Sequence, residues 1–134
     1  MTGAYRLGAG EGLEGDTALK ASRNSTLGSL TVIESDTDGG APPHIHERED
    51  EAMYVLEGEI VVHCGDEEFR AGPRDFVFMP RGELHDWDVV GERAVVLILA
   101  SPGGLEEFLA EFHTATDWTE RDRVAARHGL TFPR

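Results

Sequence analysis

The chain has 134 residues, with 12 Lys or Arg against 26 Asp or Glu, so its formal net charge is −14 at pH 7. This length suits one domain and is too short for two ordinary ones. The acidic balance would repel phosphate backbones and anionic lipid surfaces, which argues against nucleic acids and membranes as partners.

The N-terminal segment, residues 1–16, is rich in glycine and lacks apolar periodicity. It is predicted to be a flexible arm, or an edge segment that orders only against a partner. The segment has no apolar stretch typical of a signal peptide, and the longest apolar run of the chain, 94–100, is far too short to span a bilayer. We therefore expect a cytoplasmic protein.

Residues 17–101 alternate short apolar runs with turn residues, which is typical of an all-β domain. The predicted strands are 17–22, 27–35, 51–57, 59–64, 67–71, 75–79, 85–90 and 93–101. Gly65-Asp66 predicts a two-residue hairpin turn, because glycine accepts the positive φ that a type II′ turn needs. Eight strands with short turns suit a jelly roll or small barrel whose interior can hold a ligand.

Residues 102–134 change to a helical period and are predicted to be an extension of the same domain. The apolar stripe of a first helix is Leu105, Phe108, Leu109 and Phe112. A second helix is predicted to begin at Asp117, which has the spacing of a capping box with Glu120, and to end at Gly129. We expect these two short helices to cover one mouth or one outer face of the barrel rather than to carry chemistry.

Three histidines and one carboxylate form the most informative pattern of the chain. His44 and His46 lie in a segment that Pro43 biases toward extended backbone, so both side chains point to the same side. Glu51 opens the next predicted strand, and His85 follows a strand that ends at a turn. We therefore predict that the four residues bind one divalent transition metal (Fe, Mn, Ni, Co, Cu or Zn), because imidazoles and a carboxylate suit these ions.

Three further acidic residues crowd the same loop and are alternatives to Glu51: Glu47, Glu49 and Asp50. Strand parity favours Glu51, because it points the same way as Met53 and Val55 if these two line the interior. Asp50 falls on the opposite face. We interpret the segment 47–49 as solvated surface.

The candidate walls of a substrate pocket are Met53, Val55, Phe76, Phe78 and Trp87. These side chains suit core filling equally well, so both interpretations stay open. The other histidines lack companions at ligand spacing: His63, His113 and His128. His63 is expected to face outward.

The metal pattern resembles the two sequence motifs of the cupins. The first motif, G-x5-H-x-H-x(3,4)-E-x6-G, matches His44, His46, Glu51 and Gly58. The second, G-x5-P-x-G-x2-H-x3-N, matches Pro80, Gly82 and His85. The motif positions that differ are Asp38, Arg74 and Val89, none of which is a ligand. The chain looks most like single-domain bacterial cupins similar to quercetinases.

This resemblance implies a cupin jelly-roll β-barrel, a homodimer and a metal centre with open coordination positions. It also implies dioxygenase chemistry on a small enolic or phenolic, flavonol-like compound, with Glu51 as the catalytic base. A carboxylate at the rim of a partly apolar pocket is expected to have a pKa raised toward neutrality. The same scaffold also supports isomerisation, cyclisation or decarboxylation without oxygen, and non-catalytic binding of a small molecule, so these alternatives stay open.

Overall fold

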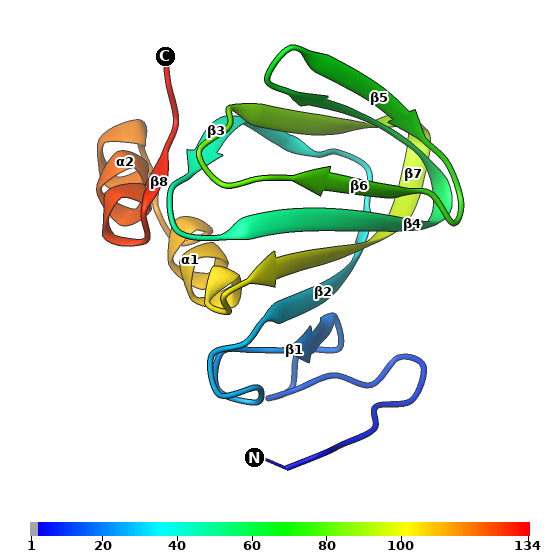
Figure 1. Ribbon diagram of the computed structural model, residues 1–134. Helices are drawn as coiled ribbons and strands as arrows, with labels where there is room; N and C mark the ends of the chain where they lie inside the picture. Colours follow the sequence, from blue (N-terminus) through cyan, green and yellow to red (C-terminus); the bar gives the residue numbers. More distant parts are fainter. Residues whose placement is uncertain (1–2) are drawn as a thin grey trace.

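The computed structural model of the protein describes residues 3–134, so the first two residues of the predicted arm 1–16 lie outside the described part. The elements, in chain order, are β1 (Leu19–Ala21), β2 (Thr31–Thr37), β3 (Ala41–His46), β4 (Asp50–Cys64), β5 (Glu67–Ala71), β6 (Phe76–Met79), β7 (His85–Ser101), α1 (Leu105–Phe112), α2 (Trp118–Arg127) and β8 (Leu130–Thr131). The predicted all-β jelly-roll barrel with two short C-terminal helices is confirmed (Figure 1).

The two long strands β4 and β7 form the spine of the barrel. They pair antiparallel along most of their lengths, from Asp50 opposite Ser101 to Cys64 opposite His85. The other side of β4 pairs with β5 and β6, and the other side of β7 pairs with β2 and β3. The strands curl around one interior, with α1 and α2 at one end of the roll (Figure 1).

Four of the predicted strands are halves of these two long strands. Gly58 and Gly91, with φ of 80° and 92°, occupy the positions where the sequence pattern breaks. Each break is a bulge-like irregularity rather than an end, because the pairing of β4 with β7 continues beyond it with a shifted register. On β4 the bulge changes which residues face inward: Met53 and Val55 before it, Ile60 and Val62 after it.

Two turns place β5 and β6. Gly65 has φ of 59°, as predicted for the turn that lets Cys64 pair with Glu67. Arg74 has φ of 74° at a position where the first residue of the second cupin motif is glycine, and its N–H donates to the Val55 carbonyl at 2.8 Å. The left-handed turn is thus retained without the glycine.

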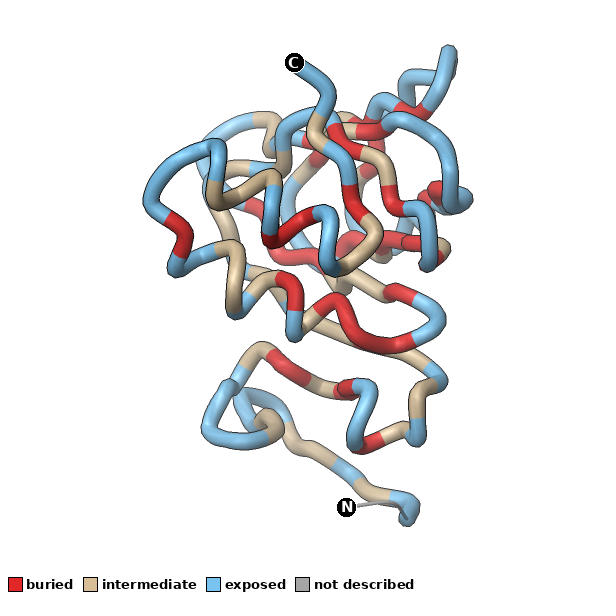
Figure 2. Tube along the Cα trace, turned by 90° about the vertical axis from the view of Figure 1, so that its left-hand side faces the viewer, coloured by how far each residue is buried: buried red, intermediate tan, exposed pale blue. Residues whose placement is uncertain are grey.

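The main core fills the interior between β4, β6 and β7. Its most buried side chains, all with 0% exposure, include Met53, Val55, Ile60, Val62, Met79 and Val96. Burial of each such side chain contributes roughly 1.5–3 kcal/mol to stability. Buried residues are concentrated on the strands and the helices, whereas most turn residues are exposed (Figure 2).

A second core fixes the C-terminal helices against the barrel. Its buried members are Ala100, Leu105, Phe108, Val124, Ala125 and Leu130. Asp117 caps α2 by accepting a hydrogen bond from the Glu120 N–H at 2.8 Å, as the capping pattern predicted. After α2 the chain adds β8, which pairs with β3 through His46 opposite Leu130. Strand β8 was not predicted, because a two-residue strand has no periodicity.

The N-terminal segment lies against β1 and the loop that follows β1 (Figure 1). The Tyr5 hydroxyl donates to the Lys20 carbonyl at 2.8 Å and lies 2.9 Å from the Ser25 hydroxyl. The flexibility of the N-terminal segment stays a prediction. Within residues 3–134, none of the helices has the length and apolar character needed to cross a membrane.

Candidate metal centre

Three strand ends bring the predicted metal ligands together. His44 and His46 end β3, Glu51 is the second residue of β4, and His85 is the first residue of β7. His44 pairs directly with His85 in the antiparallel register of β3 and β7. All four side chains are buried, and one potential ligand atom from each lies within 4.8 Å of the others.

The imidazoles of His46 and His85 point their Nε2 atoms toward the Glu51 carboxylate. His46 Nε2 lies 3.4 Å from Glu51 Oε2, and His85 Nε2 lies 3.3 Å from Glu51 Oε1. The ring of His44 lies beside both, with centroid distances of 4.9 Å to His46 and 4.3 Å to His85. The donors therefore converge on one point instead of spreading along the strands.

Hydrogen bonds on the far side of each ring fix this orientation. His44 Nδ1 lies 2.7 Å from the Pro42 carbonyl oxygen, and His85 Nδ1 lies 3.2 Å from the Glu83 carbonyl oxygen. Because a carbonyl oxygen only accepts, Nδ1 carries the proton in both residues, and the Nε2 lone pair is left for the site. Among the described residues, His85 Nε2 is a buried side-chain atom without a well-directed hydrogen-bond partner. A buried lone pair of this kind suits a metal ion.

Burial and neighbouring charges set the protonation of the cluster. Burial, followed by the charge of His85, lowers the pKa of His44 to about 4, so its imidazole is neutral at pH 7. Burial raises the pKa of Glu51, but the adjacent His85 and the charge of His46 outweigh it, so the pKa lies below its usual value. Burial lowers the pKa of His85, but the Glu51 carboxylate outweighs it and raises that pKa. The raised pKa predicted for Glu51 is therefore wrong, and Glu51 is ionised at neutral pH.

The donor set fits a divalent transition metal. Ligand atoms on opposite sides of one such ion lie about 4 Å apart, because each bond is about 2.0–2.2 Å long. The ligand atoms of the cluster, all within 4.8 Å of one another, therefore lie close to the spacing that one such ion needs. Nitrogen and carboxylate donors without a thiolate suit the late first-row ions, and four protein ligands leave positions of an octahedral ion open.

Three residues of the cluster, His44, His46 and Glu51, form one wall of a cavity of about 400 Å³ between the barrel and the C-terminal helices. Apolar side chains provide most of the remaining wall: Ile33, Ile98, Phe108, Leu109, Phe112 and Phe132. The Phe132 ring centroid lies 5.6 Å from that of His44. The helices and the C-terminal segment therefore do more than cover the barrel, because they form the apolar half of the cavity beside the candidate metal centre.

The five predicted pocket residues divide among three locations. Trp87 lines the cavity with the cluster. Met53 and Val55 have 0% exposure and belong to the main core. The prediction that Phe76 and Phe78 line the cavity is wrong, because they are 61% and 52% exposed.

The register of β6 against β4 explains the position of the two phenylalanines. Met53 pairs with Val77 and Glu51 pairs with Met79, and directly paired residues point to the same side of a sheet. Val77 and Met79 therefore face the interior, and Phe76 and Phe78 face outward. Relative strand register is a tertiary property that the sequence of β6 does not contain.

The acidic loop also differs from the sequence interpretation at one residue. Glu47 is exposed, as predicted for solvated surface, and Asp50 turns outward to accept a hydrogen bond from the Arg81 N–H at 2.9 Å. Glu49, in contrast, is only 8% exposed, and its Oε1 lies 2.7 Å from His46 Nδ1. The interpretation of Glu49 as solvated surface is therefore wrong, because the turn after β3 directs its side chain inward.

The histidines outside the metal pattern occupy separate positions. His63 faces outward as predicted, with Nδ1 2.8 Å from Asp86 Oδ1 and Nε2 2.8 Å from Glu68 Oε1. His113 lies in the wall of the cavity beside Phe112, and His128 Nε2 lies 3.4 Å from Glu111. None of these three belongs to the four-residue cluster.

Comparison with known proteins adds family evidence to this geometry. The cupin domain family model, Cupin_2, matches residues 31–101. Quercetin 2,3-dioxygenase from Bacillus subtilis (strain 168) is 29% identical over 111 residues, which are 78% of this chain and 33% of that protein. Gentisate 1,2-dioxygenase from Haloferax sp is 34% identical over 77 residues, which are 58% of this chain and 20% of that protein.

The structure of KdgF from Halomonas sp. is similar to this fold, with a TM-score of 0.53 and 27% sequence identity, and the match covers 60% of this chain and 74% of that chain.

The chain spans only 33% and 20% of the lengths of the two dioxygenases. The matched family region, 31–101, contains the whole histidine and glutamate cluster but neither C-terminal helix. The apolar half of the cavity therefore comes largely from outside the matched region.

Proposed function

The chain belongs to the cupin family, and on that premise we propose that it is a metal-dependent dioxygenase of a small enolic or phenolic compound. The observation that carries the proposal is the buried cluster of His44, His46, Glu51 and His85, of which all but His85 line a mainly apolar cavity. Similarity to two proteins named as dioxygenases, of quercetin and of gentisate, supports the choice of reaction and of a phenolic substrate.

The four cluster residues would hold the metal ion through three imidazole Nε2 atoms and one carboxylate. When bound, the ion supplies Lewis-acid polarisation of a substrate hydroxyl and the redox chemistry that dioxygen needs. The two backbone carbonyls behind His44 and His85 keep these ligands in the productive tautomer. The protein thus prepares the donors in advance of binding.

Glu51 is the residue with a capacity for proton transfer. Its low pKa makes it a carboxylate at neutral pH, so one of its oxygens can accept the proton of an enol or phenol that enters the cavity. The imidazoles would lack this capacity, because their Nε2 lone pairs would be committed to the ion and the Nδ1 atoms of His44 and His85 already carry protons. Loss of the substrate proton leaves an electron-rich anion, which is the form that reacts with an oxidant.

The apolar wall would bind and orient the substrate ring. The ring centroids of Phe112 and Phe132 lie 5.2 Å apart, and the two rings are nearly parallel. Leu109 adds aliphatic surface on α1. A flat hydroxylated ring would fit this cavity, because its carbon skeleton would pack against the phenylalanines while its oxygens point toward the cluster. The same wall excludes water from the reacting atoms.

Metal analysis combined with oxygen uptake tests the proposal. Purified protein should contain about one transition-metal ion per chain and should consume oxygen in step with the loss of an enolic or phenolic compound from a test panel. His85→Ala should abolish both, whereas His63→Ala, which removes an exposed histidine outside the cluster, should leave both unchanged.

Two outcomes would replace the proposal with one of its alternatives. Substrate loss at an unchanged rate without oxygen would exclude the dioxygenase and indicate a metal-assisted isomerase, cyclase or decarboxylase. Tight binding of a panel compound without turnover, in metal-loaded protein with oxygen present, would indicate a small-molecule-binding cupin.

A further inference from the structure

The Nδ1 atoms of the three cluster histidines have different kinds of hydrogen-bond partner. For His44 and His85 the partner is a backbone carbonyl oxygen two residues earlier. For His46 it is the side-chain carboxylate of Glu49, three residues later, at 2.7 Å. A hydrogen bond to an ionised carboxylate is stronger than one to a neutral acceptor.

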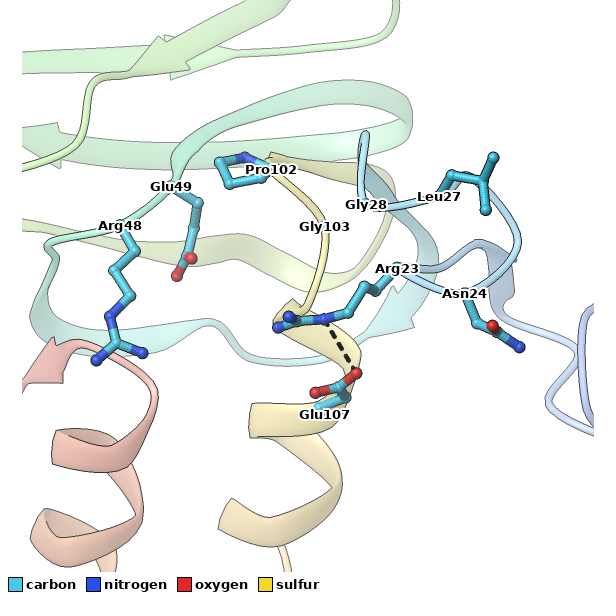
Figure 3. A pocket seen from close by; sticks show the side chains of 9 residues that line it. All are labelled: Arg23, Asn24, Leu27, Gly28, Arg48, Glu49, Pro102, Gly103 and Glu107. Atoms are coloured by element: carbon cyan, nitrogen blue, oxygen red, sulfur yellow. Dashed lines mark ion pairs between the residues drawn. The ribbon is translucent and has the colours of Figure 1, made fainter. Parts of the chain in front are cut away.

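Glu49 lies at the edge of an open surface pocket of about 760 Å³. The two arginines of this pocket have other partners, so they do not compete with His46 for the Glu49 carboxylate. Figure 3 shows the carboxylate between the side chains of Arg48 and Arg23. Arg23 instead pairs with Glu107 at 3.1 Å, and Arg48 donates to the Arg127 carbonyl oxygen at 3.1 Å. Within the described part of the chain, no lysine or arginine forms an ion pair with Glu49.

Burial makes the bond between Glu49 and His46 necessary for both groups. Glu49 is 8% exposed and His46 is 2% exposed, so a polar atom without a partner would be costly at either side chain. The opposite ring nitrogen, His46 Nε2, has a competing acceptor in Glu51 Oε2 at 3.4 Å. If the proton moved to Nε2, it would occupy the lone pair that the metal site needs.

We infer that Glu49 is a positioning residue of the metal centre, which accepts the Nδ1 proton of His46 and thereby leaves His46 Nε2 free to bind the ion. Glu49 is not itself one of the residues whose ligand atoms converge. The inference rests on the proposed metal site for its consequence, but the tautomer of His46 can be measured without metal. Glu49 is also the one support of the three that a substitution can remove, because the other two are backbone groups.

Nitrogen-15 NMR of the histidine side chains tests the first part in metal-free protein at about pH 8, where ordinary imidazoles are neutral. Wild-type His46 should be in the Nδ1–H tautomer. Glu49→Met keeps the volume of the side chain but offers no such acceptor, so His46 should shift toward Nε2–H. Glu49→Gln should restore Nδ1–H, because its amide oxygen still accepts. His44, held by the Pro42 carbonyl, is the internal control and should stay unchanged.

Binding of Co²⁺, followed by visible absorption in competition with a chelator, tests the second part. Glu49→Met should weaken binding roughly 10- to 100-fold, as loss of a hydrogen-bond partner behind a metal-ligating histidine typically does. Glu49→Gln should recover part of this loss. Glu47→Ala, which removes a carboxylate from the same loop at an exposed position, should bind Co²⁺ as the wild type does.

The inference fails if wild-type His46 is already in the Nε2–H tautomer, or if Glu49→Met retains pure Nδ1–H. It also fails if Glu49→Met changes the tautomer but binds Co²⁺ with wild-type affinity, or if Glu47→Ala weakens binding equally. A wild-type protein that binds no Co²⁺ and contains no other metal would instead refute the proposed function, and the tautomer result would still stand.

Discussion

Replacing Gly58 with alanine should destabilise the protein more than replacing Gly91, although both glycines stand at bulges of the long strands. Both have left-handed backbone, with φ of 80° and 92°. This conformation costs a residue with a Cβ atom about 1–2 kcal/mol, so both variants share that loss. A Cβ at Gly91 would meet no atom within 4 Å, whereas one at Gly58 would lie 2.5 Å from the Arg93 carbonyl oxygen.

The contact at Gly58 is with backbone, which cannot rotate away as a flexible side chain would. Forcing an added methyl group into such a site typically costs about 1–3 kcal/mol more. We therefore expect a loss of about 1–2 kcal/mol for Gly91→Ala and about 2–5 kcal/mol for Gly58→Ala. The free energy of unfolding in urea, measured on metal-free protein at one pH, gives both values. Equal losses would refute the assignment of Gly58 to a close approach of β4 and β7.

Three further predictions concern the site and the assembly. Glu51→Gln should retain some metal but lose turnover roughly 100-fold or more, and wild-type turnover by this variant would exclude a base role. The metal-free protein should lose stability as pH falls from 6.5 to about 4, because the unfolded chain protonates His44 in this interval and the folded protein does not. The loss due to His44 should reach about 3 kcal/mol and should be missing from the acid unfolding profile of His44→Gln. We also propose a homodimer, so light scattering should give twice the 14.7 kDa chain mass, and a monomer at micromolar concentration would contradict it.

The residues of the candidate metal centre could be predicted because their signals are local. His44 and His46 share one side of an extended segment, and the parity of Glu51 with Met53 points it inward. These properties depend on a few neighbouring residues and on the two-residue period of a strand. The apolar stripe of α1 and the capping pattern at Asp117 are local in the same sense.

Gly58 and Gly91 show where a local signal was correct but incomplete. Each glycine was predicted to end a strand, and in the structure each lies at a bulge within a longer strand. In the sequence, a glycine that ends a strand looks the same as a glycine that bends one, and both can have a positive φ. The difference lies in whether the partner strand continues past the bend, which here depends on β4 and β7 pairing with each other on both sides of it.

Other features were decided by contacts between distant parts of the chain. The register of β6 against β4 turned Phe76 and Phe78 away from the cavity, and the turn after β3 directed Glu49 to His46. Phe132 reached the wall beside His44 because β8 pairs with β3. Thus the residue pattern by itself determined the barrel, its helices and the set of candidate metal ligands. Only the tertiary structure decided which residues support these ligands and which residues line the cavity beside them. The reason is that strand register and contacts between distant segments leave no periodic pattern in the sequence of either segment.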